Sequence, residues 1–186
     1  ASLTGVFTAE MPTMDKAQFH VESAAMGENG TPILITQSEY MRRMKDASRY
    51  QQGMSFYGEM PDMYNVVLNA DHRLIKEVLA DMKSLLADKL QPIESELKGL
   101  HARHTAIEQS QKDKKPEELT DADKEDMKKC NDDIAAQEEA RKQIWAEYGK
   151  QNPVVPQLID LALLQNGLLR GEALSKFINR SVDLIK

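Results

Sequence analysis

The chain has 186 residues, enough for one domain with a hydrophobic core or for a small domain with an appendage. Its 24 Lys and Arg residues against 30 Asp and Glu give a formal charge of −6, which argues against nucleic acid as the main partner because a phosphate backbone calls for a basic surface. The single cysteine, Cys130, excludes an internal disulfide framework, so we expect a reducing, cytoplasmic setting. We expect no membrane partner, because no signal-peptide pattern and no apolar run of about 18 residues is present.

The first part of the chain predicts two strands and a helix. Residues 1–17 have no clear apolar period, and we interpret them as a linker or the tail of a preceding domain. Residues 18–25 alternate and residues 32–36 are apolar and β-branched, so both predict strands, and the Gly and Asn residues between them favour an antiparallel pair. Residues 37–50 predict a short amphipathic helix with Ser38 at its N-cap.

A third strand and the start of a long helix follow. Residues 51–62 carry several large apolar side chains among glycines and a proline, which is typical of a loop that covers a core or presents an apolar surface. Residues 63–69 predict a strand, and Asp71 lies near the N-cap of a helix that begins at about Arg73.

Residues 81–149 have a different period, because their apolar residues recur at intervals of three and four and predict a heptad seam. Thr120 and Asp123 have the pattern of a capping box at the start of the second helix. Two long helices joined by a polar loop return on themselves, so we expect an antiparallel coiled-coil hairpin, with Pro92 kinking the first helix or beginning a new segment. The predicted seam comprises Met82, Leu86, Leu90 or Lys89, Ile93, Leu97, Leu100, His104 and Ile107 in the first helix, and Met127, Cys130, Ile134, Gln137, Arg141, Ile144 and Tyr148 in the second.

The sequence offers no set of residues that assembles into a catalytic site. His101 and His104 lie one helical turn apart, but a zinc site needs further ligands and no HExxH motif is present. His72 fits a loop or capping position, and Cys130 on the seam fits a buried, inert thiol. No GxSxG motif and no Walker lysine occurs. We therefore expect no catalytic activity, no metal and no cofactor in this chain.

Two segments are candidates for contact with other proteins. Residues 156–186 predict a helix that Asn166 and Gly167 end, followed by a second amphipathic helix, and their apolar residues cover more than one helix face. This pattern fits either an association surface or two ordinary core helices. A methionine-rich region at residues 41–63 fits either a binding site for varied apolar segments or part of the core.

Four motifs follow one another in the chain: TPILIT, EYMRRM, MSFYGEMPDMYNVVLNADHRLIK and QLIDLALLQNGLLRGEALSKFINRSVDLI. Their order resembles the C-terminal domain of the ninety-kilodalton heat-shock chaperones, in their bacterial form HtpG. The match covers roughly residues 18–80 and 150–186. Residues 81–149 depart from the common pattern and look like an insertion of a kind associated with HtpG-like proteins of the Bacteroides group.

Residues and resemblance together predict an α+β fold with a small mixed sheet, a long antiparallel coiled-coil hairpin and a C-terminal two-helix dimerisation element. The resemblance implies a homodimer through the last two helices, and contact of unfolded client proteins with the helix that spans residues 38–50. Family members hydrolyse ATP with magnesium in other domains, so the resemblance implies no nucleotide here. The alternative, from another functional class, is a coiled-coil adaptor or scaffold that acts through residues 81–149.

The interface could use either face of the first terminal helix. We expect Ile159 and Leu163, with the face of the last helix that carries Phe177 and Ile178, to meet a second copy of the chain. Leu158, Leu161 and Ala162 on the other face would hold the terminal helix pair to the chain's own sheet, and the assignment of the two faces stays open. The predicted dimer-interface residues are Leu158, Ile159, Leu161, Ala162, Leu163, Leu164, Leu174, Phe177, Ile178 and Ile185. The predicted client-binding residues are Tyr40, Met41, Met44 and Met54, of which the resemblance implies the client-facing positions of Tyr40 and Met44.

Overall fold

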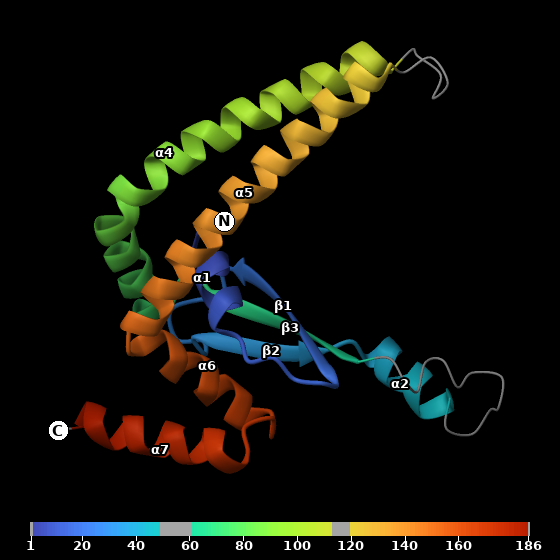
Figure 1. Cartoon of the computed structure of the whole chain (residues 1–186). Coiled ribbons are helices and arrows are strands. Elements are labelled where there is room, and N and C mark those ends of the chain that lie inside the picture. The colour runs from blue at the N-terminus through green and yellow to red at the C-terminus, as the bar shows by residue number, and fades with distance from the viewer. Residues whose placement is uncertain (1, 49–60, 113–119, 186) are drawn as a thin grey trace. The chain divides into compact units, whose positions relative to one another are not determined.

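A computed structural model describes residues 2–48, 61–112 and 120–185, without the side chains at positions 41, 45, 48, 184 and 185. It confirms the predicted α+β fold with a small mixed sheet. The chain forms two compact units, Ala1–Met82 with Ala146–Lys186, and Lys83–Trp145. The described elements are α1 (Ser2–Glu10), β1 (Ala17–Ala24), β2 (Ile33–Gln37), α2 (Glu39–Ser48), β3 (Asp62–Asn69), α4 (Arg73–Gln111), α5 (Asp121–Gln151), α6 (Val154–Gln165) and α7 (Gly171–Ile185), as Figure 1 shows.

The three strands have the order β1-β3-β2, with β3 parallel to β1 and antiparallel to β2 (Figure 1). The predicted antiparallel pairing of β1 with β2 is therefore wrong, because β3 lies between them. The central position suits β3 because Val66 and Leu68, in its second half, are apolar and buried. A central strand is covered by a neighbour on both sides, which suits the most apolar segment.

The loop between β1 and β2 turns as its residues predict, but it crosses the end of β3 instead of forming a tight hairpin. Gly27 has a φ of +81°, and its carbonyl accepts a hydrogen bond from the Gly30 amide at 3.2 Å. The fully buried Asn69 holds this loop: its Oδ1 accepts from the backbone amides of Met26 and Asp71, each at 3.1 Å, and its Nδ2 donates to the Gly27 carbonyl at 2.8 Å.

One face of the sheet carries the core of the first unit. The register places Val21, Val66 and Ile35 side by side on this face, and α1 packs on β1 while α6 packs on β2 and on α1. Residues 1–17, which we interpreted as a linker or the tail of a preceding domain, include α1, and this helix buries Leu3, Val6 and Phe7. The three buried residues have the i, i+3, i+4 spacing of one helix face, but they span little more than one turn, which is too short to establish a period from sequence.

The second unit is an antiparallel helical hairpin, as predicted. Gln137 Nε2 of α5 donates to Glu96 Oε2 of α4 at 2.8 Å, and Arg103 lies 3.2 Å from Asp126. Later residues of α4 thus meet earlier residues of α5, which requires an antiparallel arrangement. The seam residues Leu86, Leu90, Leu97 and Cys130 are buried, together with Trp145, which the predicted seam did not include.

Residues near the start of each hairpin helix cap it through local hydrogen bonds. The Thr120 amide donates to Asp123 Oδ2 at 3.0 Å and the Asp123 amide donates to Thr120 Oγ1 at 3.1 Å, so the predicted capping box is confirmed. Pro92 does not begin a new segment, since α4 runs through it. At the start of α4, the Leu74 amide donates to His72 Nδ1 at 3.2 Å, which confirms the capping position predicted for His72.

Candidate functional site

Helix α6 is the element on which the candidate interface is built. Asn152 Oδ1 accepts a hydrogen bond from the Val154 amide at 2.9 Å and so caps the start of α6. The Nδ2 of the same side chain donates to the Tyr148 hydroxyl oxygen at 2.8 Å, and this hydroxyl lies 2.8 Å from Asp81 Oδ2. Burial, the hydrogen bond to Asp81 and the charge of Asp81 together raise the pKa of Tyr148 above its ordinary value. A polar cluster of the buried Tyr148, the half-buried Asn152 and the exposed Asp81 therefore fixes where α6 begins.

The C-terminal end of α6 is the stop that the sequence predicts. Asn166 is the C-cap and Gly167 has a φ of +67°, a backbone conformation that favours glycine. The Leu168 amide donates to the Leu163 carbonyl at 2.9 Å and the Gly167 amide donates to the Leu164 carbonyl at 3.0 Å. These two bonds are those of a Schellman motif, and they turn the chain towards α7.

The two apolar faces of α6 have different surroundings. Leu158, Ile159, Ala162 and Leu163 are buried in the core of their own chain. Ile159 and Leu163, which we expected to meet a second copy, are thus already covered, as are Leu158 and Ala162. Leu161, which we expected to face the chain's own sheet together with Leu158 and Ala162, is 38% exposed, as is Leu164. The outward face of α6 is therefore the one that Leu161 and Leu164 occupy.

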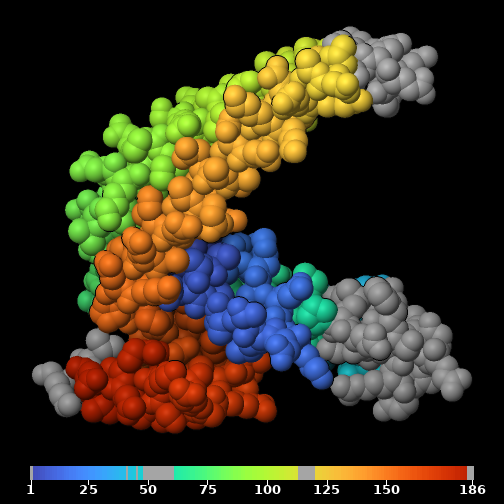
Figure 2. All heavy atoms as spheres, in the orientation of Figure 1, coloured from blue at the N-terminus to red at the C-terminus, as the bar shows by residue number. Residues whose placement is uncertain are grey.

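Helix α7 packs on α6 with one stripe and leaves another exposed. Leu174 and Phe177 are half-buried, and Ile178 and Val182 are each 50% exposed. The described part of the chain does not include the side chain of Ile185, so that predicted interface residue stays a prediction. Figure 2 shows α7, in red, on the outside of its unit. The exposed stripe continues the i, i+4 spacing from Leu174 through Ile178 to Val182, a residue that the predicted interface omitted.

Polar groups join α7 to α6 beneath this surface. Arg180 forms an ion pair with Asp160, and Gln157 Nε2 donates to Ser181 Oγ. Burial raises the pKa of Asp160 and outweighs the opposing effect of Arg180. The two helices are thus held at a defined offset, which places Leu161, Leu164, Ile178 and Val182 on solvent-facing positions.

The predicted client-binding residues lie on and after α2. Tyr40 is 69% exposed and Met44 is half-buried, whereas the side chain of Met41 and the whole of Met54 lie outside the described residues. The polar side of α2 carries an ion pair between Arg43 and Glu39 at 2.5 Å. The described part of α2 is therefore a surface helix with a large aromatic side chain in solvent.

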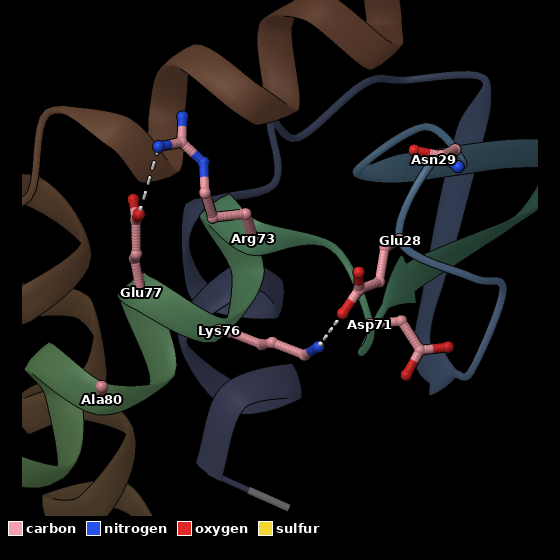
Figure 3. A pocket seen from close by; sticks show the side chains of 7 residues that line it. All are labelled: Glu28, Asn29, Asp71, Arg73, Lys76, Glu77 and Ala80. Carbon is pink, nitrogen blue, oxygen red and sulfur yellow. Dashed lines mark hydrogen bonds and ion pairs between the residues drawn. The ribbon is translucent and has the colours of Figure 1, made fainter.

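A pocket of about 570 Å³ lies where the loop after β1 meets the start of α4 (Figure 3). Lys76 Nζ lies 3.3 Å from Glu28 Oε1, and Arg73 lies 3.7 Å from Glu77. Asp71 Oδ2 in the same pocket accepts a hydrogen bond from the Gly27 amide at 2.9 Å. Lys76 and Asp71 therefore join the loop to the start of α4, while Arg73 pairs with Glu77 within the helix.

The described residues contain no cluster of three or more His, Cys, Asp or Glu side chains that could hold a metal ion. His104 Nδ1 lies 3.6 Å from Glu108 Oε2 on its own helix. None of the described helices is both long enough and apolar enough to span a membrane.

Asn69 is the structurally important residue that the sequence analysis did not predict. A signal for it was present, because a polar residue at the end of the apolar run VVLN is typical of a buried side chain with hydrogen-bond partners.

Three relatives show what this chain is similar to. It is 49% identical over 187 residues to the chaperone protein HtpG of Bacteroides fragilis, 46% identical over 184 residues to that of Bacteroides thetaiotaomicron, and 43% identical over 185 residues to that of Porphyromonas gingivalis. Each match covers 99% or more of this chain and 27% of the relative, so the chain spans about a quarter of the length of these relatives. No family model and no solved structure matches the chain.

Proposed function

Because its homologues are HtpG chaperones, we propose that this chain is the domain through which such a chaperone forms a homodimer and contacts client proteins. The resemblance to HtpG chaperones of the Bacteroides group, which the sequence analysis stated, is confirmed by these relatives. Within this proposal, residues 18–80 and 150–186 are the chaperone domain and residues 81–149 are an inserted hairpin. The matches cover 99% or more of the chain, so these relatives share the hairpin region as well.

The observation that carries the dimer proposal is the concentration of exposed apolar side chains on α6 and α7. Half of the large apolar residues that stand out as exposed in the described chain belong to these two helices: Leu161, Leu164, Ile178 and Val182. Monomeric proteins seldom expose contiguous apolar surface without a use for it. A second copy of the same surface would cover it, because a twofold interface is self-complementary.

Sedimentation equilibrium of the chain at tens of micromolar tests the dimer. We expect Leu161→Asp or Ile178→Asp to convert the dimer to a monomer with unchanged helicity, because each places a charge in an apolar contact without disturbing the core. The matched control is Leu85→Asp, which also places a charge on an exposed leucine but lies on the hairpin, and which should leave the dimer intact. A wild-type chain that sediments as a monomer would contradict the proposal.

Client contact is proposed for α2, with Tyr40 as the main contact and Met44 beside it. Tyr40→Ser combined with Met44→Ser should weaken binding of permanently unfolded, reduced and carboxymethylated α-lactalbumin, measured by fluorescence anisotropy. Leu34→Ser removes an exposed apolar residue of β2 and serves as the control that should bind normally. Equal affinity of the parent chain, the double variant and the Leu34→Ser control would show that Tyr40 and Met44 do not contact the client.

The same proposal places ATP hydrolysis and magnesium binding in the parts of the full-length protein that this chain does not match. Catalysis and cofactor binding are not assigned to any residue of this chain.

A further inference from the structure

Strand β1 forms an edge of the sheet, and this edge is open beyond its first residue, Ala17, whose amide donates to the Met14 carbonyl at 3.3 Å. The Lys16 carbonyl accepts from the Asp62 amide at 2.8 Å, and the Ala24 carbonyl accepts from the Ala70 amide at 2.9 Å. In a parallel ladder only alternate residues of a strand bond to the neighbour, so the even-numbered residues of β1 face β3. The backbone groups of Phe19, Val21 and Ser23 therefore point outward. Within the described residues, no hydrogen bond reaches these outward groups.

The core also thins towards this edge. On the covered face of the sheet, Val66 of β3 and Ile35 of β2 are buried, whereas Val21 in the same row on β1 is only half-buried. Phe19 is likewise half-buried and stacks on Tyr64, with 5.6 Å between the ring centroids. A further strand beside β1 would cover the exposed sides of Phe19 and Val21.

Natural proteins usually protect an edge strand with a proline, a bulge or an inward-pointing charge. The eight residues of β1, AQFHVESA, contain no proline, and they pair with β3 in an unbroken register without a bulge. The charged residue Glu22 points to the opposite, solvent-facing side of the sheet, in the same row as Val67 and Leu34. A basic side chain on an added strand would lie directly beside this carboxylate, where opposite charges attract.

We propose that the outer edge of β1 binds an extended peptide segment of a non-native protein as a fourth strand. The segment has apolar side chains beside Phe19 and Val21 on the covered face, and a Lys or Arg beside Glu22 on the other. Main-chain hydrogen bonds supply affinity in this mode of binding, and alternate side chains supply selectivity. The inference rests on the proposed chaperone function, but it uses a surface distinct from the Tyr40 side of α2.

The test uses a fluorescein-labelled peptide of alternating Val and Thr in which one Thr is replaced by Arg, titrated with the whole chain and followed by anisotropy. Two further peptides carry backbone N-methyl groups, one on the Val residues and the other on the Thr residues. Since only one edge of the peptide can pair with β1, one methylated peptide should bind at least about tenfold more weakly and the other should be affected much less. Equal affinity of the two methylated peptides would overturn the proposal.

A charge exchange tests the register without endangering the fold, because Glu22 is exposed. Glu22→Lys should weaken binding of the Arg peptide by about two- to fivefold and strengthen binding of a matched peptide with Glu in place of Arg. An unchanged preference would overturn the assignment. If Glu22→Lys alters the sedimentation of the chain alone while peptide binding stays the same, the edge pairs with a second copy and the proposal is wrong.

The two proposals can fail separately. Suppose that the Tyr40→Ser, Met44→Ser variant loses α-lactalbumin binding and that the edge peptide does not bind the parent chain. Client contact at α2 would then be supported, and the proposal for the β1 edge would be wrong. If one methylated peptide binds more weakly than the other and that variant still binds α-lactalbumin normally, the β1 edge would be supported as a peptide site. Client contact at α2 would then be wrong.

Discussion

The two compact units bury their apolar residues in different ways. In the α/β unit the sheet and the helices α1 and α6 enclose a layer in which Phe7, Leu68 and Leu163 are fully buried. In the hairpin unit the two helices cover only the side that faces the partner helix, and most seam positions are half-exposed. Cys130 is its one fully buried side chain among those described. The comparison indicates that the α/β unit depends on contacts between distant segments, while the hairpin depends on a repeated local pattern.

The largest expected effect comes from removing the hairpin unit, which tests whether the α/β unit folds and dimerises without it. Replacing residues 83–145 by a short Gly/Ser loop should leave the α/β unit folded and dimeric, because its buried core lies outside the deleted range. Circular dichroism and sedimentation equilibrium measure the two properties. The adaptor alternative predicts instead that a partner bound by the parent chain is lost, whereas an unfolded product would show that the unit cannot fold alone.

Within the α/β unit, Leu163→Ala should destabilise the fold by about 2–5 kcal/mol, because it opens a cavity at a fully buried position. Urea unfolding followed by circular dichroism gives the free energy of unfolding. Leu85→Ala truncates a leucine that is 61% exposed on the hairpin and should change stability by less than about 0.5 kcal/mol. Equal effects of the two substitutions would contradict the layered core described for the α/β unit.

A smaller effect is expected at the polar cluster that fixes the start of α6. Tyr148→Phe removes the hydroxyl that bonds to Asp81 and Asn152, and it should cost about 1 kcal/mol of unfolding free energy. Tyr40→Phe, at an exposed tyrosine, is the control and should be neutral.

The same cluster predicts a pH dependence. The pKa of Tyr148 is higher in the folded chain than the ordinary value of about 10, so its contribution to stability is complete below pH ~10 and is lost as the pH rises further. The unfolding free energy should therefore fall more steeply above pH ~10 in the parent chain than in Tyr148→Phe. Parallel pH profiles would exclude Tyr148 as the source of the fall.

The elements that the sequence predicted best are those with a local cause. The capping box at Thr120, the stop at Gly167 and the hairpin seam all follow from residues a few positions apart, and all are present in the structure. The pairing of β1 was predicted wrongly, because the turn residues between β1 and β2 indicate that the chain turns but do not indicate which strand lies beside it. α1 was missed because its three buried residues, Leu3, Val6 and Phe7, span little more than one helical turn.

The candidate interface shows the same division. The sequence by itself determined that residues 156–186 form two helices with more apolar surface than one face requires, since helical spacing and the Asn166–Gly167 stop are local properties. Only the tertiary structure decided that the Ile159 and Leu163 face is covered by the chain's own core, while Leu161 and Leu164 stay exposed. The physical reason is that a helix with two apolar faces can bury either one, and the choice depends on the shape of the sheet and of α1 against which it packs.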